Sequence, residues 1–101
     1  MYGHMDKQPH GEGWNTDPCD PVIKDGLLYG RGSSDDGYAL FSAILSIKAA
    51  QVCEGKHPKC VITIEGAEES GDADLVYYLN TYKHLLGDPT LLVCLDSGAF
   101  V

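Results

Sequence analysis

The sequence predicts an α/β domain with a mainly parallel sheet and helices on its faces. Residues 60–64 and 91–95 are apolar, and the first run is also β-branched, as strands covered on both faces are. Residues 36–53 and 72–86 carry apolar side chains at helical spacing. The order strand, helix, strand, helix, strand is typical of a parallel sheet with right-handed crossovers.

The N-terminal third is expected to hold one hairpin and two irregular segments. Residues 2–4 have no apolar strand before them, and a loop rich in Gly, Pro and Asp follows to about Pro21. Long loops of this kind are usually functional or disordered. Residues 22–24 and 27–29 flank Asp25-Gly26, a dipeptide that tolerates the positive φ angles of a tight hairpin turn. Residues 30–34 are expected to be irregular again.

The two helical segments are expected to pack against the sheet. For residues 72–86, Ser70 or Asp72 is a suitable cap and Gly87 a suitable stop. For residues 36–53 we predict a largely buried helix, because a broad apolar face repeats along it. That face consists of Leu40, Phe41, Ala43, Ile44, Leu45, Ile47, Ala50 and Val52.

Composition limits the classes of partner. The chain has 101 residues, enough for one small domain, and 44% of them are hydrophobic, which favours a folded chain. Fifteen acidic against seven basic residues give a formal charge of −8, so we expect neither nucleic acid nor an anionic membrane as a partner. Cations suit this charge, although for the charge taken alone an ordinary solvated acidic surface is the favoured explanation.

Cysteine usage and hydropathy predict a cytoplasmic location. Cys19, Cys53, Cys60 and Cys94 form no C-x-x-C pair, and the apolar segments around some of them favour buried free thiols. No run approaches the roughly 18 apolar residues of a membrane span, and the N-terminus lacks the pattern of a signal peptide.

Acidic clusters sit where apolar segments end. Glu68-Glu69 follows one predicted strand and Asp96 follows another, while Asp35-Asp36 precedes a predicted helix and His4-x-Asp6 lies near the start. In parallel sheets, ligands bind beyond the carboxyl ends of the strands, so these side chains are expected to meet. Clustered carboxylates repel one another unless cations or solvent neutralise them. The pattern therefore favours a metal site.

The donor types narrow the choice of metal. Asp, Glu and His without Cys suit zinc, manganese or cobalt, and the scarcity of His favours a carboxylate-rich pair of metals sharing a bridging ligand. Taken singly, each cluster has a simpler interpretation: Glu68-Glu69 as a solvated surface, and Asp35-Asp36 as a helix cap. Gly30-Arg31-Gly32 resembles the start of a dinucleotide fingerprint, but Asp35 stands where its third glycine belongs.

Five sequence strings together resemble a known family. YGHMDKQP, GW-x-TDP, DG-x-LYGRG-x-x-DD, IEGAEESG and LDSG occur in this order over nearly the whole chain. They resemble the zinc-dependent exopeptidases that include carnosine dipeptidases, aminoacylases and succinyl-diaminopimelate desuccinylases, with the carnosine-dipeptidase-like branch as the nearest. The resemblance implies that residues 1–101 are a partial catalytic domain. The lid and dimerisation domain, the C-terminal part of the catalytic domain and a second zinc histidine would be absent.

The resemblance also implies roles for the clustered side chains. Two divalent metal ions, zinc with manganese or cobalt as alternatives, would be held by His4 and Asp96 on one side and Glu69 on the other, with Asp35 bridging both. Glu68 would be the general base and Asp6 would orient the imidazole of His4. The family pattern further implies a cis peptide bond between Asp35 and Asp36. This chain departs from many members at Gly37-Tyr38, where they have Lys-Gly.

The implied activity is hydrolysis of a peptide or amide bond by a water activated between two metals. The substrate would be a dipeptide or an N-acyl amino acid, so an amidohydrolase acting on N-acyl amino acids is the alternative within enzymes. A non-catalytic binding module descended from such an enzyme, or more distantly a nucleotide-binding domain, is the alternative outside them. The segment alone is expected to bind metal weakly and to be inactive, and a homodimer is expected only for a full-length parent.

Overall fold

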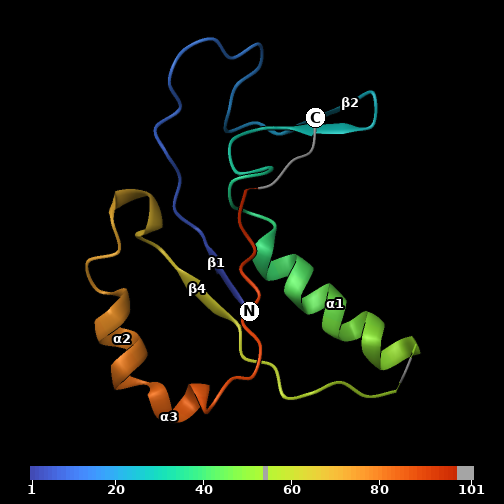
Figure 1. Cartoon of the computed structure of the whole chain (residues 1–101). Helices are drawn as coiled ribbons and strands as arrows, with labels where there is room; N and C mark the ends of the chain where they lie inside the picture. The colour runs from blue at the N-terminus through green and yellow to red at the C-terminus, as the bar shows by residue number, and fades with distance from the viewer. Residues whose placement is uncertain (54, 98–101) are drawn as a thin grey trace.

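A short parallel sheet lies at the centre of the computed structural model, which describes residues 1–53 and 55–97. Strand β1 (Tyr2–His4) pairs in parallel with β4 (Thr63–Glu65), so that His4 and Glu65 are neighbours at the carboxyl ends. On its other side β1 meets the returning chain through a parallel bridge between Tyr2 and Cys94. Figure 1 shows β1 between these two segments.

The predicted parallel arrangement is therefore present, but on a smaller scale than expected. β1 was not predicted, because residues 2–4 are too few and too mixed in polarity to show a strand pattern. Residues 91–95 contribute the bridge at Cys94 but no regular strand. The described residues form two separate two-stranded sheets, one parallel and one antiparallel, rather than one extended parallel sheet.

The antiparallel sheet is the predicted hairpin. Strand β2 (Val22–Lys24) pairs with β3 (Leu27–Tyr29), and both turn residues have positive φ, 53° at Asp25 and 80° at Gly26. Two consecutive positive φ values give the twist that a two-residue hairpin requires. The hairpin prediction is confirmed at these bounds.

The helices differ from their predicted bounds. Helix α1 (Ala39–Cys53) begins three residues later than expected, after an irregular loop. The segment predicted as one helix is divided into α2 (Leu75–Thr81) and α3 (Lys83–Leu86) on either side of Tyr82. A short 3-10 helix, η1 (Glu68–Ser70), follows β4. Gly87 ends α3 as predicted, but neither Ser70 nor Asp72 caps α2.

Burial is much lower than the sequence predicts. The buried hydrophobic residues are Ala39 and Ala43 on α1, which packs against β1. The prediction of a largely buried helix is wrong, because two strands and a bridge cover only one side of α1. A cavity of about 550 Å³ separates β4 from α2 and α3, so the opposite layer is also loosely packed.

The cysteines follow the same pattern. All four are free, but Cys60 is half-buried and the other three are exposed, so the expectation of buried thiols is wrong. Cys60 and Cys94 lie in apolar segments, yet neither thiol is fully buried. None of the described helices has the length and hydropathy that crossing a membrane requires.

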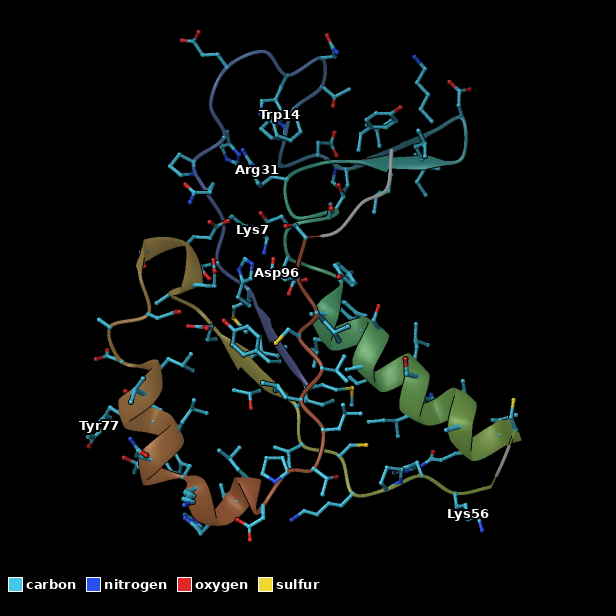
Figure 2. The ribbon with its side chains drawn as sticks, in the orientation of Figure 1. Lys7, Trp14, Arg31, Lys56, Tyr77 and Asp96 are labelled. Carbon is cyan, nitrogen blue, oxygen red and sulfur yellow. The ribbon has the colours of Figure 1, made fainter. Side chains whose placement is uncertain are left out.

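The side chain of Arg31 makes several contacts with the long N-terminal loop. Arg31 donates hydrogen bonds to the carbonyl oxygens of Pro9 and His10, at 3.0 Å each, and its guanidinium lies 5.2 Å from the ring centre of Trp14. The indole of Trp14 donates to the same His10 oxygen at 2.6 Å. In Figure 2, Trp14 and Arg31 lie together above the sheet, so this loop is held against the segment that follows β3.

Candidate metal centre

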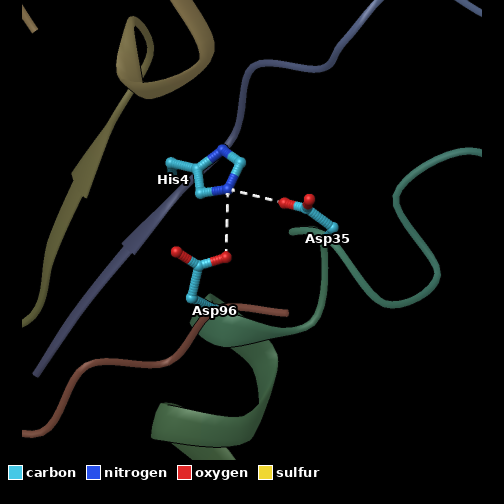
Figure 3. A group of neighbouring side chains, drawn as sticks. All are labelled: His4, Asp35 and Asp96. Atoms are coloured by element: carbon cyan, nitrogen blue, oxygen red, sulfur yellow. Dashed lines mark hydrogen bonds and ion pairs between the residues drawn. The ribbon is translucent and has the colours of Figure 1, made fainter. Parts of the chain in front are cut away.

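His4 is the centre of the candidate site. It is the last residue of β1 and only 2% of its surface is exposed. Ring atom Nε2 lies 3.0 Å from Oδ1 of Asp35 and 3.6 Å from Oδ1 of Asp96, as Figure 3 shows. The other ring nitrogen, Nδ1, lies 3.3 Å from Oδ1 of Asp6. The imidazole therefore has carboxylates on both sides.

Chain topology explains why these distant residues meet. Asp96 follows the bridge at Cys94, which places it beside the end of β1. Asp35 lies in the loop before α1, and α1 packs against β1. Because the ends of the parallel segments point the same way, their following residues share one edge of the sheet.

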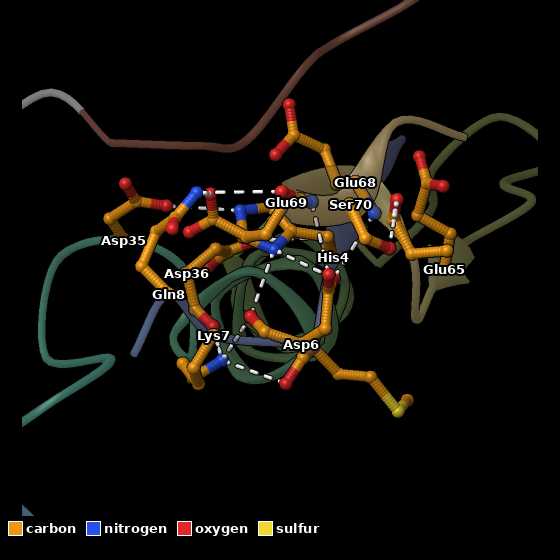
Figure 4. A network of polar contacts seen from close by, with 12 residues as sticks. His4, Asp6, Lys7, Gln8, Asp35, Asp36, Glu65, Glu68, Glu69 and Ser70 are labelled. Atoms are coloured by element: carbon orange, nitrogen blue, oxygen red, sulfur yellow. Dashed lines mark hydrogen bonds and ion pairs between the residues drawn. The ribbon is translucent and has the colours of Figure 1, made fainter. Parts of the chain in front are cut away.

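Asp6 joins His4 to the Glu68-Glu69 pair, which sequence reasoning did not foresee. Its Oδ1 accepts the backbone N–H of Glu68 at 3.2 Å, and its Oδ2 accepts that of Glu69 at 3.0 Å. The amide of Gln8 donates to Oε2 of Glu69 at 2.6 Å. Figure 4 shows these contacts in one network around His4. Asp6 thus fixes the turn that carries both glutamates relative to the imidazole.

Asp36 has a structural task. It is completely buried, and its two carboxylate oxygens accept the backbone N–H groups of His4 and Ala39, each at 3.0 Å. Because Ala39 is the first residue of α1, Asp36 satisfies a free donor at the helix start, as the capping interpretation of the pair proposed. In the sequence, an acidic residue shortly before a predicted helix was the sign of this capping role.

The predicted cis bond between Asp35 and Asp36 is wrong. None of the described peptide bonds is cis. The trans form is strongly favoured for a peptide bond that does not precede proline. With the trans bond in place, the carboxylate of Asp36 accepts the N–H groups of both His4 and Ala39.

The carboxylates change the proton affinities of the centre. Burial favours neutral imidazole, but the contact with Asp35 and the charge of Asp96 outweigh it and raise the pKa of His4. Burial would raise the pKa of Asp6, yet the N–H groups of Glu69 and Glu68 lower it. For Glu68, burial and the charges of Asp96 and Glu69 raise the pKa, against the opposing effect of His4. The centre thus attracts positive charge.

Two groups of side chains have the spacing of metal ligands. His4 with Asp35 and Asp96 forms one, and His4 with Glu68 and Glu69 forms the other; within each, the ligand atoms lie within 4.8 Å of one another. Imidazole nitrogen and carboxylate oxygen are suitable donors for zinc, manganese and cobalt. All six residues predicted for the site, the five of these groups and Asp6, lie in this one cluster.

Comparison with known proteins places this cluster in a family context. The sequence pattern of peptidase family M20/M25/M40 matches residues 1–94. An uncharacterized metallohydrolase of Methanocaldococcus jannaschii is 36% identical over 97% of this chain, which corresponds to 25% of that protein. The human Beta-Ala-His dipeptidase is 40% identical over 74% of the chain, corresponding to 15% of its length.

A third relative has another named activity. The succinyl-diaminopimelate desuccinylase of Nautilia profundicola is 38% identical over 70% of this chain and 18% of its own length. The chain thus spans a quarter or less of the length of these relatives. The match over residues 1–94 includes all but the last of the predicted ligands, and the chain belongs to peptidase family M20/M25/M40.

Proposed function

We propose that this chain is the metal-binding part of a hydrolase that cleaves a peptide or amide bond with the help of two divalent metal ions, zinc in the first place and manganese or cobalt as alternatives. The observation that supports this most directly is the convergence of carboxylates on both ring nitrogens of the buried His4. Membership of the family and the named activities of two relatives agree with it.

Each ligand has a proposed place. His4 and Asp96 would hold one metal, Glu69 the other, and Asp35 both. Bound metals of this kind polarise a carbonyl group and lower the pKa of a coordinated water. The donor set around His4 suits them, since each of the two ligand groups already has its atoms within 4.8 Å.

Glu68 is the proposed general base. Its carboxylate would accept a proton from the attacking water and deliver it to the nitrogen of the leaving amine. Asp6 supports this role because it accepts the N–H groups of Glu68 and Glu69 and so orients the turn that presents them. The substrate is proposed to be a dipeptide or an N-acyl amino acid.

The relatives are much longer than this chain, which suggests what the segment can do by itself. Since the chain corresponds to 15–25% of them, we propose that residues 1–101 are a partial catalytic domain. A second metal-binding histidine, a lid and a dimerisation surface would be supplied by the remainder of a full-length parent. The segment by itself is then expected to bind metal weakly and to be inactive.

Substitution of Glu68 and Asp35 tests the assigned roles in the full-length protein that carries this segment. Glu68→Gln should abolish turnover and leave metal content, measured by plasma mass spectrometry, nearly intact, because the base would not be a ligand. Asp35→Asn should lose metal as well as turnover, because it removes a charge from the bridging ligand. Equal metal loss in the two variants would contradict the roles.

A substrate panel separates the candidate activities. Chelator-sensitive hydrolysis of dipeptides supports a dipeptidase, and preference for N-acyl amino acids supports the alternative that the desuccinylase relative favours. A full-length protein that holds no metal but still binds these ligands would be a binding module and would contradict the enzymatic proposal.

A further inference from the structure

Lys7 lies beside the proposed metal centre, and its ammonium group contacts three backbone carbonyl oxygens. Nζ donates to the oxygen of Met5 at 2.8 Å, to that of Asp6 at 3.2 Å and to that of Asp36. The first two oxygens belong to the segment after β1, whereas the third belongs to the loop before α1, 29 residues away from Lys7. Figure 4 shows the ammonium between these segments.

The stem of Lys7 is as closely fitted as its ammonium. A Cβ atom at Gly32 would lie 2.4 Å from Cε of Lys7 and 3.1 Å from its Cδ, so any other residue at position 32 would displace the stem from this place. Gly32 also has a φ of 83°, which side chains rarely adopt. A Cβ at Gly37 would lie 2.4 Å from the Gly32 oxygen, so the two ends of the loop that contains Asp35 are in close contact.

The partners of Lys7 are chemically informative. Although Asp6, Asp35 and Asp36 are near, no ion pair within 4.0 Å joins Lys7 to a carboxylate in the part of the chain that the structure describes. Its positive charge therefore offsets the repulsion between the carboxylates without occupying the oxygens that a metal needs. Hydrogen bonds from an ammonium are also stronger than those from a neutral donor.

We propose that Lys7 is a positioning residue that fixes the loop of Asp35 against the end of β1, so that Asp35 and His4 are held at the separation a shared metal requires. This inference rests on the proposed metal centre. Without the ammonium, the oxygen of Asp36 loses its donor and the two segments lose their direct link through Lys7. Asp35 then moves relative to Nε2 of His4, although every metal ligand remains.

The test compares Lys7→Met, which keeps the stem and removes the charge, with Lys48→Met on the exposed side of α1. Co²⁺ alone is titrated by calorimetry into the full-length protein that carries each substitution, and its visible absorption reports the coordination geometry. Loss of a group that supports metal ligands typically weakens affinity about 10–100-fold. Lys7→Met should weaken Co²⁺ binding by about tenfold or more and change the spectrum, whereas Lys48→Met should match the wild type.

A metal-free measurement keeps the two proposals apart. The ring signals of His4 in ¹⁵N NMR spectra of the apo protein should shift in Lys7→Met and stay in place in Lys48→Met. A full-length wild-type protein that binds no Co²⁺ would contradict the metal centre, and the His4 signals would still decide the role of Lys7. Unchanged affinity, spectrum and His4 signals in a folded Lys7→Met variant would overturn the role of Lys7.

Folding of the variant is checked by circular dichroism. If Lys7→Met does not fold, Lys7→Arg replaces it, because a planar guanidinium keeps the charge but cannot reproduce the three ammonium contacts. Lys7→Arg should then bind Co²⁺ more weakly than the wild type with an altered spectrum, and wild-type behaviour would overturn the proposal.

Discussion

At the scale of the residue, Asp36 shows how a buried carboxylate is held by backbone donors. Both of its oxygens are satisfied, one by the N–H group of His4 and the other by that of Ala39. A buried charge without hydrogen-bond partners would destabilise the folded state by roughly several kcal/mol. These two hydrogen bonds therefore allow the carboxylate to be buried at this position. The same contacts tie the end of β1 to the start of α1.

Replacing Asp36 tests this account. Asp36→Asn leaves one oxygen to accept and turns an NH₂ group toward the second N–H donor, so one buried donor loses its partner. We expect a loss of about 1–3 kcal/mol in the free energy of unfolding, measured with urea at neutral pH. Asp88→Asn, at an exposed site, is the control and should have little effect. Equal stability of the two variants would show that the contacts of Asp36 contribute nothing.

At the scale of the element, β1 has only three residues but contacts three other segments of the chain. It pairs with β4, bridges to Cys94 and packs against α1. Gly3 makes this possible, since a Cβ there would lie 2.3 Å from the Cβ of Ala39 and 2.7 Å from Oδ2 of Asp36. The helix can approach the strand only because that side chain is missing.

Gly3→Ala should therefore destabilise the protein. The added methyl group must displace α1 or the carboxylate of Asp36, and overpacking of this kind costs about 1–3 kcal/mol. Thermal unfolding followed by circular dichroism measures the effect. Gly66→Ala is the matched control, because its Cβ would meet only Cγ of Met5, at 3.9 Å. If the two glycine variants unfold at the same temperature, the close approach of α1 to β1 does not contribute to the free energy of unfolding.

The same elements show what can be predicted from sequence. The hairpin was predicted at its observed bounds because its turn depends on Asp25 and Gly26 alone. β1 could not be predicted, because three residues form a strand there only through partners about 60 and 90 positions away. The break between α2 and α3 at Tyr82 could not be predicted either, because no Gly or Pro lies there.

The clustering of the candidate ligands was easier to predict than the fold around them. His4, Asp35 and Asp96 were grouped from their places at segment ends and from the family strings, and the structure brings them together. The contacts of Asp6 with the Glu68 turn, and those of Lys7 with three carbonyl oxygens, depend on backbone geometry. No pattern of residue types reveals them.

At the scale of the whole molecule, apolar side chains remain on the surface. Phe41, Leu45 and Val52 are 65%, 64% and 84% exposed and recur at helical spacing along one side of α1. Exposed apolar side chains gathered on one side of a helix are typical of contact regions between proteins or domains. The side of α1 that faces β1 is the one occupied by the buried Ala39 and Ala43.

This stripe should make the chain self-associate. We expect the weight-average mass in sedimentation experiments to rise with protein concentration, because association removes Phe41 and Leu45 from water. The double variant Phe41→Glu, Leu45→Lys should suppress that rise without changing net charge. The control is Ser46→Glu with Gln51→Lys, which places the same charges on α1 away from the stripe. Similar association of the two double variants would exclude the stripe as the contact.

The position of His4 at the meeting point of four chain segments links metal affinity to folding. Its neighbours lie 31 positions away at Asp35 and far beyond that in the Glu68 turn and at Asp96. Joining such distant segments costs loop-closure entropy before any ligand atom is in place. A metal would then meet a complete set of donors only in molecules whose chain has already closed, so its occupancy reports the fraction of closed chains and raises it by mass action.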